Sequence, residues 1–379
     1  MTLLDPPAWD FRGILHQMAC SPPDSQPAAP SSAARRTAET SAASVAVIGC
    51  GGWGTALAML LDSNCHQAVL WGVEPDYMRQ MAETRLNPRF LPGIEVPRSV
   101  RLSADLADCV PSCEVVVMAT PTLYLRAICK QVGKHLREDQ FVVNVAKGIE
   151  EGSLLLASQV VADVCGNAGR LAGLYGPSHA PEVSRRMPTT VVATSTDPKL
   201  AHRAQRLFMG PTFRVYTNTD VTGVELGAAL KNVIAIAAGV CDGLGFGDNA
   251  KSALLTRGLA EMARLGVAMG ARAATFAGLS GLGDLITTCI SPYGRNRAVG
   301  MRIARGESLE HILATMDQVA EGVRTTKSAC ALADRYGVTM PITRAVHAVL
   351  FEGVDARRAG MELMGRAPRP EHDAEPVLP

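Results

Sequence analysis

A glycine-rich loop between a strand-like run and a helical run is the feature that most restricts the fold of this chain. Residues 44–48 (SVAVI) are apolar and β-branched in part, and GCGGWGTALAMLL follows at once over 49–61. Gly49, Gly51 and Gly54 match G-x-G-x-x-G, the fingerprint of a dinucleotide site. The first glycine permits a tight turn, the second lets the backbone approach a pyrophosphate, and the third lets the helix pack on the strand. Backbone N–H groups at the helix start, that of Trp53 among them, would hold the phosphates.

A second strand-like run, AVLW over 68–71, is followed by Glu74, which lies 20 residues beyond Gly54. An acidic residue at about this distance can bind the adenosine ribose hydroxyls of a dinucleotide. The alternative is a plain glycine-rich turn between a strand and a helix. The two signals together favour the nucleotide site.

Four more apolar runs predict further strands: EVVVMAT (114–120), FVVNVA (141–146), LAGLY (171–175) and TTVVAT (189–194). Because helical stretches separate them, we expect a parallel sheet covered on both faces. Ligands of such sheets bind beyond the carboxyl ends of the strands. TPT (120–122), KG (147–148) and GPSHAPE (176–182) stand at such ends. His179 in the last of these could act as an acid or base, but we interpret it as incidental because no carboxylate motif accompanies it.

The strand-like runs stop at about Thr222, and the rest of the chain is predicted to be helical. VELGAALKNVIAIAAGVC over 224–241 is apolar on nearly every side, which predicts a buried helix whose only charges are Glu225 and Lys231. Burying a lysine costs desolvation energy unless the ammonium is paired with an anion or has a role in catalysis. Burial also lowers the pKa of a lysine towards the range useful for proton transfer. The alternative is a lysine at the helix edge that reaches solvent.

Two shorter motifs lie in the helical half. GLGFGDN (243–249) imitates a second glycine fingerprint, but it follows a helix-like stretch, so we predict a turn between helices. GRNR (294–297) begins another helical stretch, where two arginines and free backbone N–H groups suit a phosphate. A solvated basic turn is the alternative.

Charge and composition exclude several classes of protein. Lys and Arg total 37 and Asp and Glu 36, so the formal charge is +1, which excludes binding to nucleic acid or an anionic membrane through bulk charge. The longest uncharged stretch, 40–61, holds four glycines and should split into a strand and a turn instead of spanning a membrane. The 10 cysteines include no C-x-x-C pair. We therefore expect most of them to be reduced, buried side chains in the core of a cytoplasmic protein, and we expect no metal site.

Four regions are expected along the chain. Residues 1–43 are rich in Pro, Ala and Ser without a signal or transit pattern, which predicts a disordered, non-targeting extension. Residues 44–219 are predicted to form the nucleotide-binding Rossmann-type domain and 220–366 the helical substrate and catalytic domain. Residues 367–379 are predicted to be a loose tail.

Taken together, the motifs resemble the NAD(P)-dependent glycerol-3-phosphate dehydrogenases of the soluble bacterial type, over about 44–366. The resemblance rests on the order and spacing of GCGGWGTALA, LW, NP-FLP (87–92), KG, GPSHAPE, GVELGAALKNVIAIAAG, GLGD, GRNR and VAEG. It implies an α/β N-terminal Rossmann-type domain plus an all-α C-terminal domain, with the active site between them. It also implies reduction of dihydroxyacetone phosphate to sn-glycerol 3-phosphate by NADH or NADPH for phospholipid synthesis, without a metal, in a homodimer.

The resemblance carries roles over to single residues. Lys231 would be the proton donor and acceptor, and Asp284 would lie beside it. The complete set predicted for the cofactor is Gly49, Gly51, Gly52, Trp53, Gly54, Glu74, Lys147, Ala180, Arg295, Val319 and Glu321. The set predicted for the substrate is Lys147, Gly176, Ser178, Lys231, Asp284, Gly294, Arg295 and Asn296.

The sequence departs from the family pattern at two positions. Val73 stands where the family often has a basic residue, and Glu74 is adjacent, so we expect a weaker preference for NADPH and some lean to NADH. Gly294 stands where the family commonly has Ser, so one hydroxyl contact to the substrate would be lost.

Two rival functions differ from this prediction. One is a 3-hydroxyacid or 6-phosphogluconate type of dehydrogenase, which the matches over 224–239 and 281–284 disfavour. The other is a nucleotide sensor without catalysis, which would have no need to keep Lys147, Lys231, Asp284 and Arg295 together.

Overall fold

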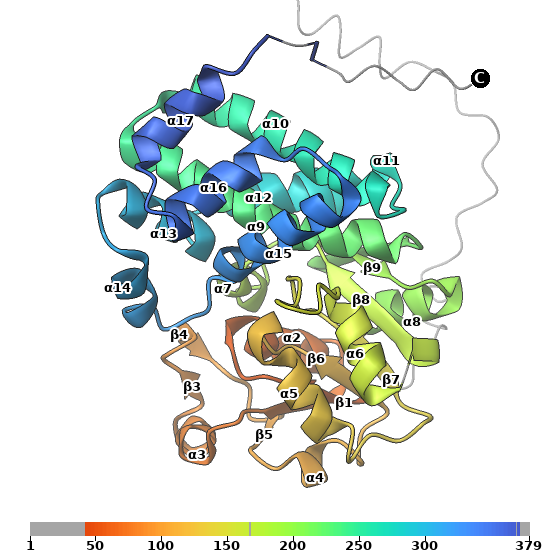
Figure 1. Cartoon of the computed structure of the whole chain (residues 1–379). Helices are drawn as coiled ribbons and strands as arrows, with labels where there is room; N and C mark the ends of the chain where they lie inside the picture. Colours follow the sequence, from red (N-terminus) through yellow and green to blue (C-terminus); the bar gives the residue numbers. More distant parts are fainter. Residues whose placement is uncertain (1–41, 167, 369, 372–379) are drawn as a thin grey trace, which may run out of the picture. The chain divides into compact units, whose positions relative to one another are not determined.

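Apolar strands of the first half assemble into an eight-stranded sheet (Figure 1). The computed structural model describes residues 42–166, 168–368 and 370–371, so the expectations for 1–41 and 372–379 lie outside the described residues. The strand order is β10-β9-β8-β7-β6-β1-β2-β5, and β3 and β4 form a separate antiparallel pair. The strands are β1 Ser44–Ile48, β2 Gln67–Trp71, β3 Leu86–Asn87, β4 Leu91–Glu95, β5 Arg101–Ser103, β6 Val115–Met118, β7 Phe141–Asn144, β8 Leu171–Tyr175, β9 Thr189–Thr194 and β10 Phe213–Asn218.

Helices follow most of these strands and make up nearly all of the second half. The first half contains α2 Gly52–Ser63, α3 Pro75–Thr84, α4 Leu106–Cys109, α5 Thr122–Val132, α6 Ala157–Cys165, α7 Ala180–Ser184 and α8 Pro198–Phe208. The second half contains α9 Val221–Leu244, α10 Gly247–Ala268, α11 Ala273–Phe276, α12 Asp284–Ile290, α13 Arg295–Ala304, α14 Leu309–Ala314, α15 Glu321–Tyr336, α16 Pro341–Phe351 and α17 Ala356–Met364. A π-helical turn, Leu279–Gly283, leads into α12.

The expectation of a wholly parallel sheet is wrong at one edge. Strand β9 pairs with β8 antiparallel, and β10 then pairs with β9 parallel. The reason is the connection after β8, which carries only the short helix α7 and does not cross back over the sheet, as a parallel neighbour would require. The carboxyl ends of β1, β6, β7 and β8 nevertheless share one edge, because these strands are parallel.

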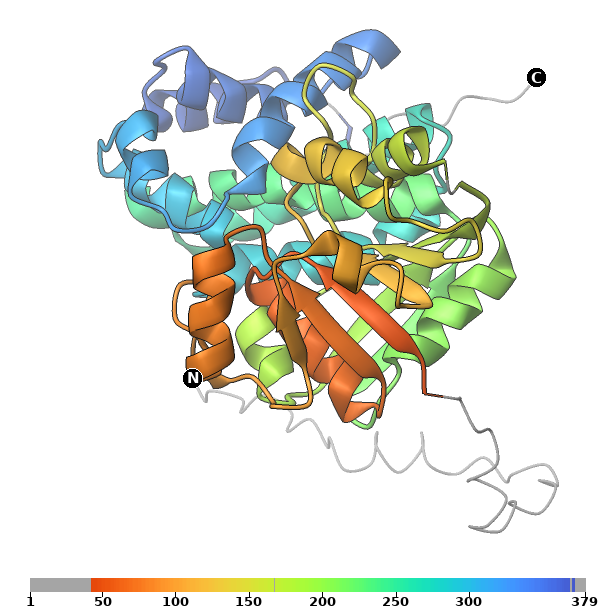
Figure 2. The same ribbon diagram turned by 90° about the horizontal axis from the view of Figure 1, so that it is seen from below.

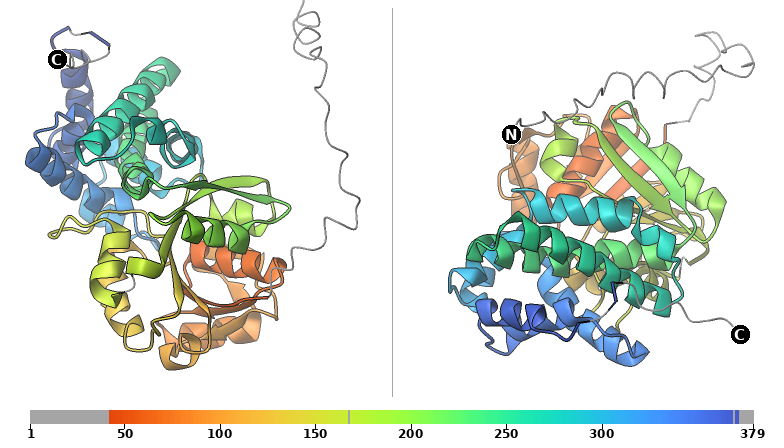
Figure 3. Two further views of the ribbon diagram at one scale, coloured as in Figure 1. Left: turned by 90° about the vertical axis from the view of Figure 1, so that its right-hand side faces the viewer. Right: turned by 90° about the horizontal axis from the view of Figure 1, so that it is seen from above.

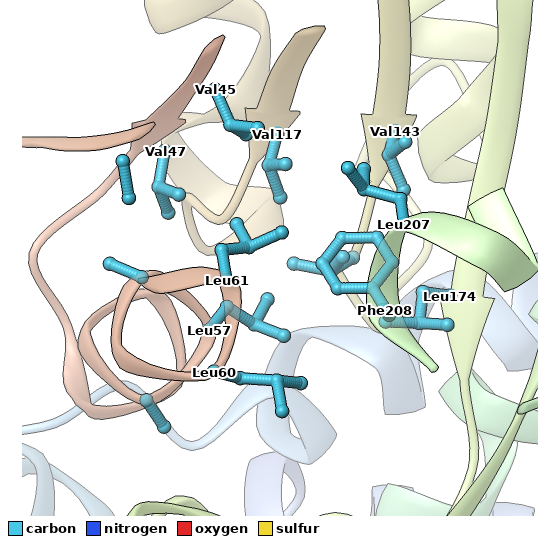
Figure 4. Packing of buried hydrophobic residues seen from close by; sticks show 14 of the residues in the cluster. Val45, Val47, Leu57, Leu60, Leu61, Val117, Val143, Leu174, Leu207 and Phe208 are labelled. Carbon is cyan, nitrogen blue, oxygen red and sulfur yellow. The ribbon is translucent and has the colours of Figure 1, made fainter. Parts of the chain in front are cut away.

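Both faces of the sheet are covered, as predicted, because residues of each strand alternate between two cores. Val45 and Val47 of β1 pack in one core with Leu57 of α2, whereas Ile48 packs in the other with Leu125 of α5. Figure 4 shows the first core, in which α2 and α8 cover β1, β6, β7 and β8. Figure 2 shows the strands side by side with helices on either face.

Helix α9 is the central element of the second half, in agreement with its apolar sequence. It packs against α10, α12, α13 and α15, and Figure 1 labels it among these helices. Figure 3 shows the helical half, coloured green to blue, from two further sides. Its approach to α13 depends on two glycines. A Cβ atom at Gly239 would come within 2.0 Å of the Arg297 carbonyl oxygen, and one at Gly300 within 2.0 Å of the Ile236 carbonyl oxygen.

The turn between α9 and α10 lies within the segment 243–249, as predicted, but it is confined to Gly245 and Phe246, because α9 ends at Leu244 and α10 begins at Gly247. Gly245 and Gly247 take positive φ angles there. In the described part of the chain, α9 and the segment Ala273–Ile290 are long and apolar enough to cross a membrane by length and composition. Helix α9 is mostly buried inside the protein, which is also the behaviour of a core helix.

Candidate functional site

Two lysines share one buried carboxylate where the sheet meets the helical half. Lys231 of α9 donates from Nζ to Asp284 Oδ1 at 2.5 Å and to Thr288 Oγ1 at 2.6 Å. Lys147, which follows β7, donates from Nζ to Asp284 Oδ2 at 3.0 Å. Asp284 is 2% exposed and Lys231 5% exposed. The structure therefore brings together three of the predicted residues, from segments far apart in the sequence.

Burial decides the protonation behaviour of this cluster. It lowers the pKa of Lys231 to about 8, since the ammonium loses its hydration; the Asp284 charge opposes this shift and the Lys147 charge adds to it. Burial alone would raise the pKa of Asp284, but the charges of Lys147 and Lys231 outweigh it and hold that pKa below its ordinary value. Lys231 can therefore be either an acid or a base near neutral pH.

The loop after β8 contributes backbone and hydroxyl oxygen atoms to the same cluster. Lys147 Nζ donates to the Gly176 carbonyl oxygen at 2.9 Å and lies 3.4 Å from Ser178 Oγ. Gly176 has a φ of +128°, a conformation that favours glycine. The predicted substrate residues Gly176 and Ser178 thus lie beside Lys147.

A chain of amides links the lysines to the start of α13. Asn232 Nδ2 donates to the Lys147 carbonyl oxygen at 3.2 Å, and Asn296 Nδ2 donates to Asn232 Oδ1 at 2.9 Å. Asn296 Oδ1 in turn accepts from the Gly322 N–H at 2.9 Å. Arg295, the first residue of α13, is exposed, and no described carboxylate forms an ion pair with it. Its guanidinium and the N-terminus of α13 can therefore receive an anion.

Gly294 has a packing role that the sequence did not reveal. A Cβ atom there would come within 2.7 Å of the Thr288 carbonyl oxygen, so a serine would require a shift of α12 or α13. Glycine at this position keeps the start of α13 close to the segment that holds Lys231.

The glycine fingerprint has the geometry expected of it. Gly49 has a φ of +127°, and a Cβ atom at Gly54 would come within 1.9 Å of the Gly49 carbonyl oxygen. A Cβ atom at Gly51 would instead point into open space. The Trp53 Nε1 atom in this loop is buried, and no described residue accepts its hydrogen bond. Open space beside Gly51 and an unpartnered donor fit a dinucleotide phosphate group.

Three segments meet at this loop. A Cβ atom at Gly52 would come within 2.6 Å of the Phe90 carbonyl oxygen and 3.5 Å of the Ala180 Cβ atom. Gln318 Nε2 donates to that same Phe90 oxygen at 3.3 Å. The predicted cofactor residue Ala180, at the start of α7, therefore lies next to the fingerprint, and Val319 follows Gln318 in the chain.

Glu321 joins the helical half to the end of β6. Its Oε1 atom accepts from the Thr122 N–H at 2.7 Å, and burial raises the pKa of its carboxyl. Gly148 lies at the same place, because a Cβ atom there would approach Thr122 Oγ1 to 2.5 Å and Glu321 Oε2 to 2.9 Å. Thr122 Oγ1 is buried and has no partner in the described chain.

Glu74 lies after β2, as predicted, but it is paired. It occupies the N-cap position of α3 without a side-chain capping bond, and its Oε1 atom accepts from Arg89 Nη1 at 2.8 Å. Val73 beside it is exposed. A cation therefore reaches Glu74 from the β3–β4 segment, which the sequence did not predict.

Sequence reasoning missed several residues of the site. Thr288 is one turn after Asp284, a spacing that could have suggested it. His179 was interpreted as incidental, yet its Nε2 atom is buried and has no described partner. Burial lowers the pKa of His179, and the charges of Lys231 and Lys147 add to that shift, which favours the neutral form of the ring.

Comparison with known proteins identifies relatives along most of the chain. Residues 44–201 match the family model described as NAD-dependent glycerol-3-phosphate dehydrogenase N-terminus, and residues 220–360 match the model for the C-terminus. A glycerol-3-phosphate dehydrogenase, NAD(P)+, of Pelotomaculum thermopropionicum is 48% identical over 335 residues, which are 88% of this chain and 95% of the relative.

Solved structures agree with this result. The crystal structure of glycerol-3-phosphate dehydrogenase from Coxiella burnetii is 34% identical with a TM-score of 0.82, covering 86% of this chain and 99% of that one. The yeast glycerol-3-phosphate dehydrogenase GPD1 is 27% identical with a TM-score of 0.73, covering 86% and 100%. The fold class predicted from the sequence, a Rossmann-type half followed by a helical half, is confirmed.

Proposed function

The chain belongs to the NAD-dependent glycerol-3-phosphate dehydrogenase family, and we propose that it interconverts dihydroxyacetone phosphate and sn-glycerol 3-phosphate with NADH or NADPH. The product would supply glycerophospholipid synthesis. The observation that carries the proposal is the buried Lys231, which Asp284 holds beside Lys147. Asn232 connects this cluster to Asn296 at the start of α13.

The substrate phosphate would be bound at the start of α13. Arg295 is exposed without an ion-pair partner among the described residues, and the adjoining backbone N–H groups of the helix favour an anion. Asn296 follows it, fixed by Asn232. Anchoring the phosphate away from the reacting carbon would orient the ketone towards Lys231, and such positioning lowers the entropic part of the barrier.

Lys231 would move the proton. Bound NADH or NADPH supplies the hydride to the ketone carbon. Negative charge then develops on the carbonyl oxygen, which the Lys231 ammonium stabilises and protonates. Asp284 keeps that ammonium oriented and partly offsets the effect of burial on its pKa. In the oxidation of glycerol 3-phosphate, the neutral amine accepts the proton.

The dinucleotide would lie along the fingerprint loop. Gly49, Gly51 and Gly54 suit the close approach of a pyrophosphate, and the unpartnered Trp53 Nε1 supports a polar ligand there. Lys147, Ala180, Val319 and Glu321 complete the proposed contacts.

Three expectations about the protein as a whole remain proposals. The division into domains at 219/220 is supported by the change from strand β10, ending at Asn218, to helix α9, beginning at Val221. A homodimer rests on the resemblance to the family and is tested by multi-angle light scattering. A cytoplasmic location rests on the cysteine usage and on the same resemblance.

The deciding experiment follows the oxidation of NADH and NADPH by absorbance with the purified full chain. Dihydroxyacetone phosphate should be reduced, and glyoxylate, acetoacetate and methylmalonate semialdehyde should not. Turnover of a carbonyl acid in preference to dihydroxyacetone phosphate would favour the hydroxyacid dehydrogenase rival. Tight cofactor binding without turnover of any of these compounds would favour the nucleotide sensor.

A further inference from the structure

An arginine from another segment stands beside the acid that follows β2. Arg89 Nη1 lies 2.8 Å from Glu74 Oε1, although the two residues are 15 apart in the sequence. Their side chains are 44% and 57% exposed, so a ligand can reach both. In dinucleotide-binding folds, an acid at this place binds the ribose 2′-hydroxyl, and a nearby arginine accommodates a 2′-phosphate.

The position of Arg89 is fixed by its segment. The Arg89 N–H donates to Tyr77 Oη at 3.2 Å, which ties this loop to α3. Asn87 Nδ2 donates to the Cys50 carbonyl oxygen and to Thr55 Oγ1, each at 2.8 Å, which ties it to the glycine fingerprint. The guanidinium also lies 5.0 Å from the centre of the Phe90 ring. Arg89 is therefore held at the adenosine end of the proposed cofactor site by contacts on both sides.

The charges at this place explain how both cofactors could be accepted. Glu74 alone would repel a 2′-phosphate, and Val73 offers no cation. Arg89 neutralises Glu74, and its exposed ion pair is the kind that is broken at little cost. A dianionic phosphate can then take the guanidinium with two parallel hydrogen bonds, a stronger contact than the single one to Glu74.

We propose that Arg89 is the specificity-determining residue for the ribose 2′ position: it binds the 2′-phosphate of NADPH in place of the basic residue absent at Val73, while Glu74 binds the 2′-hydroxyl of NADH. This inference rests on the proposed function for the identity of the cofactor. Val73 and Glu74 alone led us to expect a preference for NADH. With Arg89 at this place, we expect the protein to use both NADH and NADPH.

The test measures the dissociation constants of NADPH and NADH by tryptophan fluorescence, and those of 2′,5′-ADP and 5′-AMP by calorimetry, without any substrate. Arg89→Met should raise the ratio of the NADPH constant to the NADH constant by about tenfold or more, as the loss of a charge-assisted contact implies. The ratio for 2′,5′-ADP to 5′-AMP should rise in parallel. Glu74→Gln should lower both ratios, because it removes a repelling charge.

Two controls make the result specific. Arg79→Met removes another exposed arginine, in α3, that pairs with Asp76 instead of Glu74, and both ratios should stay at the wild-type value. In the Glu74→Gln background, Arg89→Met should still raise the ratios, because its effect is on the phosphate and not only on Glu74. Melting temperatures of all variants check that the fold is kept.

Several outcomes would overturn the inference. These are unchanged ratios in Arg89→Met, the same rise in Arg79→Met, or no effect of Arg89→Met once Glu74 is Gln. The binding data separate this inference from the proposed reaction. A chain that shows the expected ratios but does not reduce dihydroxyacetone phosphate keeps the role of Arg89 and loses the proposed function. A chain that reduces dihydroxyacetone phosphate, but in which Arg89→Met leaves the ratios unchanged, keeps the proposed function and loses the role of Arg89.

Discussion

Lys231 shows how a single residue acquires chemistry from its surroundings. The sequence predicted a lysine in an apolar helix but left a solvent-reaching side chain as the alternative. The structure buries it and gives it Asp284 and Thr288 as partners. Burial lowers its pKa to about 8, so a proton can leave or return within the pH range in which enzymes work.

The rates of reduction and of oxidation should therefore change in opposite directions as the pH rises. Reduction of dihydroxyacetone phosphate needs the ammonium, so kcat should fall as pH rises through about 8; oxidation of glycerol 3-phosphate needs the amine and should increase over the same range. Asp284→Asn removes a charge that raises this pKa, so both midpoints should move to lower pH. Steady-state rates between pH 6 and 10 provide the measurement.

The same assay tests whether Lys231 is the acid at all. Lys231→Ala should lower kcat by about 10²–10⁴-fold, the usual contribution of a positioned proton donor. Lys130→Ala, at the exposed end of α5, serves as the matched control and should retain wild-type turnover. A pH profile of Lys231→Ala that keeps the wild-type midpoint would assign the titration to another group.

At the scale of elements, a buried network fastens α9 to the sheet. Tyr175 of β8 donates from Oη to Glu225 Oε1 of α9 at 2.5 Å, and Asn144 of β7 donates to Tyr175 Oη at 2.6 Å. Ser158 of α6 donates to Glu225 Oε2 at 2.8 Å. Asn144 Oδ1 also accepts from the Ala146 N–H, directly before Lys147. The network thus connects the helix that carries Lys231 with the strand end that carries Lys147.

Tyr175→Phe should destabilise the protein without changing the shape of the ring. Glu225 and Asn144 would each lose a buried partner, and a buried polar group left unpaired costs about 1–3 kcal/mol. Denaturant unfolding should show a loss of this size. Tyr216→Phe in β10, where the ring is half exposed, should change the free energy of unfolding by less than about 0.5 kcal/mol. Equal stabilities of the two variants would mean that the network contributes nothing to stability.

At the scale of the whole molecule, the described residues share apolar cores across the predicted domain boundary. Ile149 and Leu156, which precede 219, pack with Leu226 and Leu230 of α9 in one core. Tyr175 and Val192 of the sheet pack with Val224 and Ala228 in another. The described chain from Ala42 onward forms one compact unit. The two halves identified from the sequence are therefore not independent in their packing.

Scanning calorimetry should accordingly show one unfolding transition, with equal calorimetric and van't Hoff enthalpies. NADH at about 100 times its dissociation constant should stabilise the folded state by about 2.7 kcal/mol and raise the whole transition together. Two resolved transitions, of which NADH shifts only one, would show that the halves unfold separately and that the shared cores are too small to couple them.

The sequence by itself determined six of the eight strands of the sheet, the buried central helix and the residue types of the site, whereas it did not reveal β5 and β10. The glycine fingerprint, the apolar strand runs and the buried helix that carries Lys231 are local patterns, and a local pattern follows from the periodicity of burial and from backbone conformation. The order of the motifs was sufficient to predict the family. Only the tertiary structure decided that β9 runs antiparallel to β8, that Thr288 joins Asp284 in holding Lys231, and that Arg89 stands beside Glu74. These features join segments distant in the chain, and their geometry depends on the packing of the whole fold instead of on any local pattern.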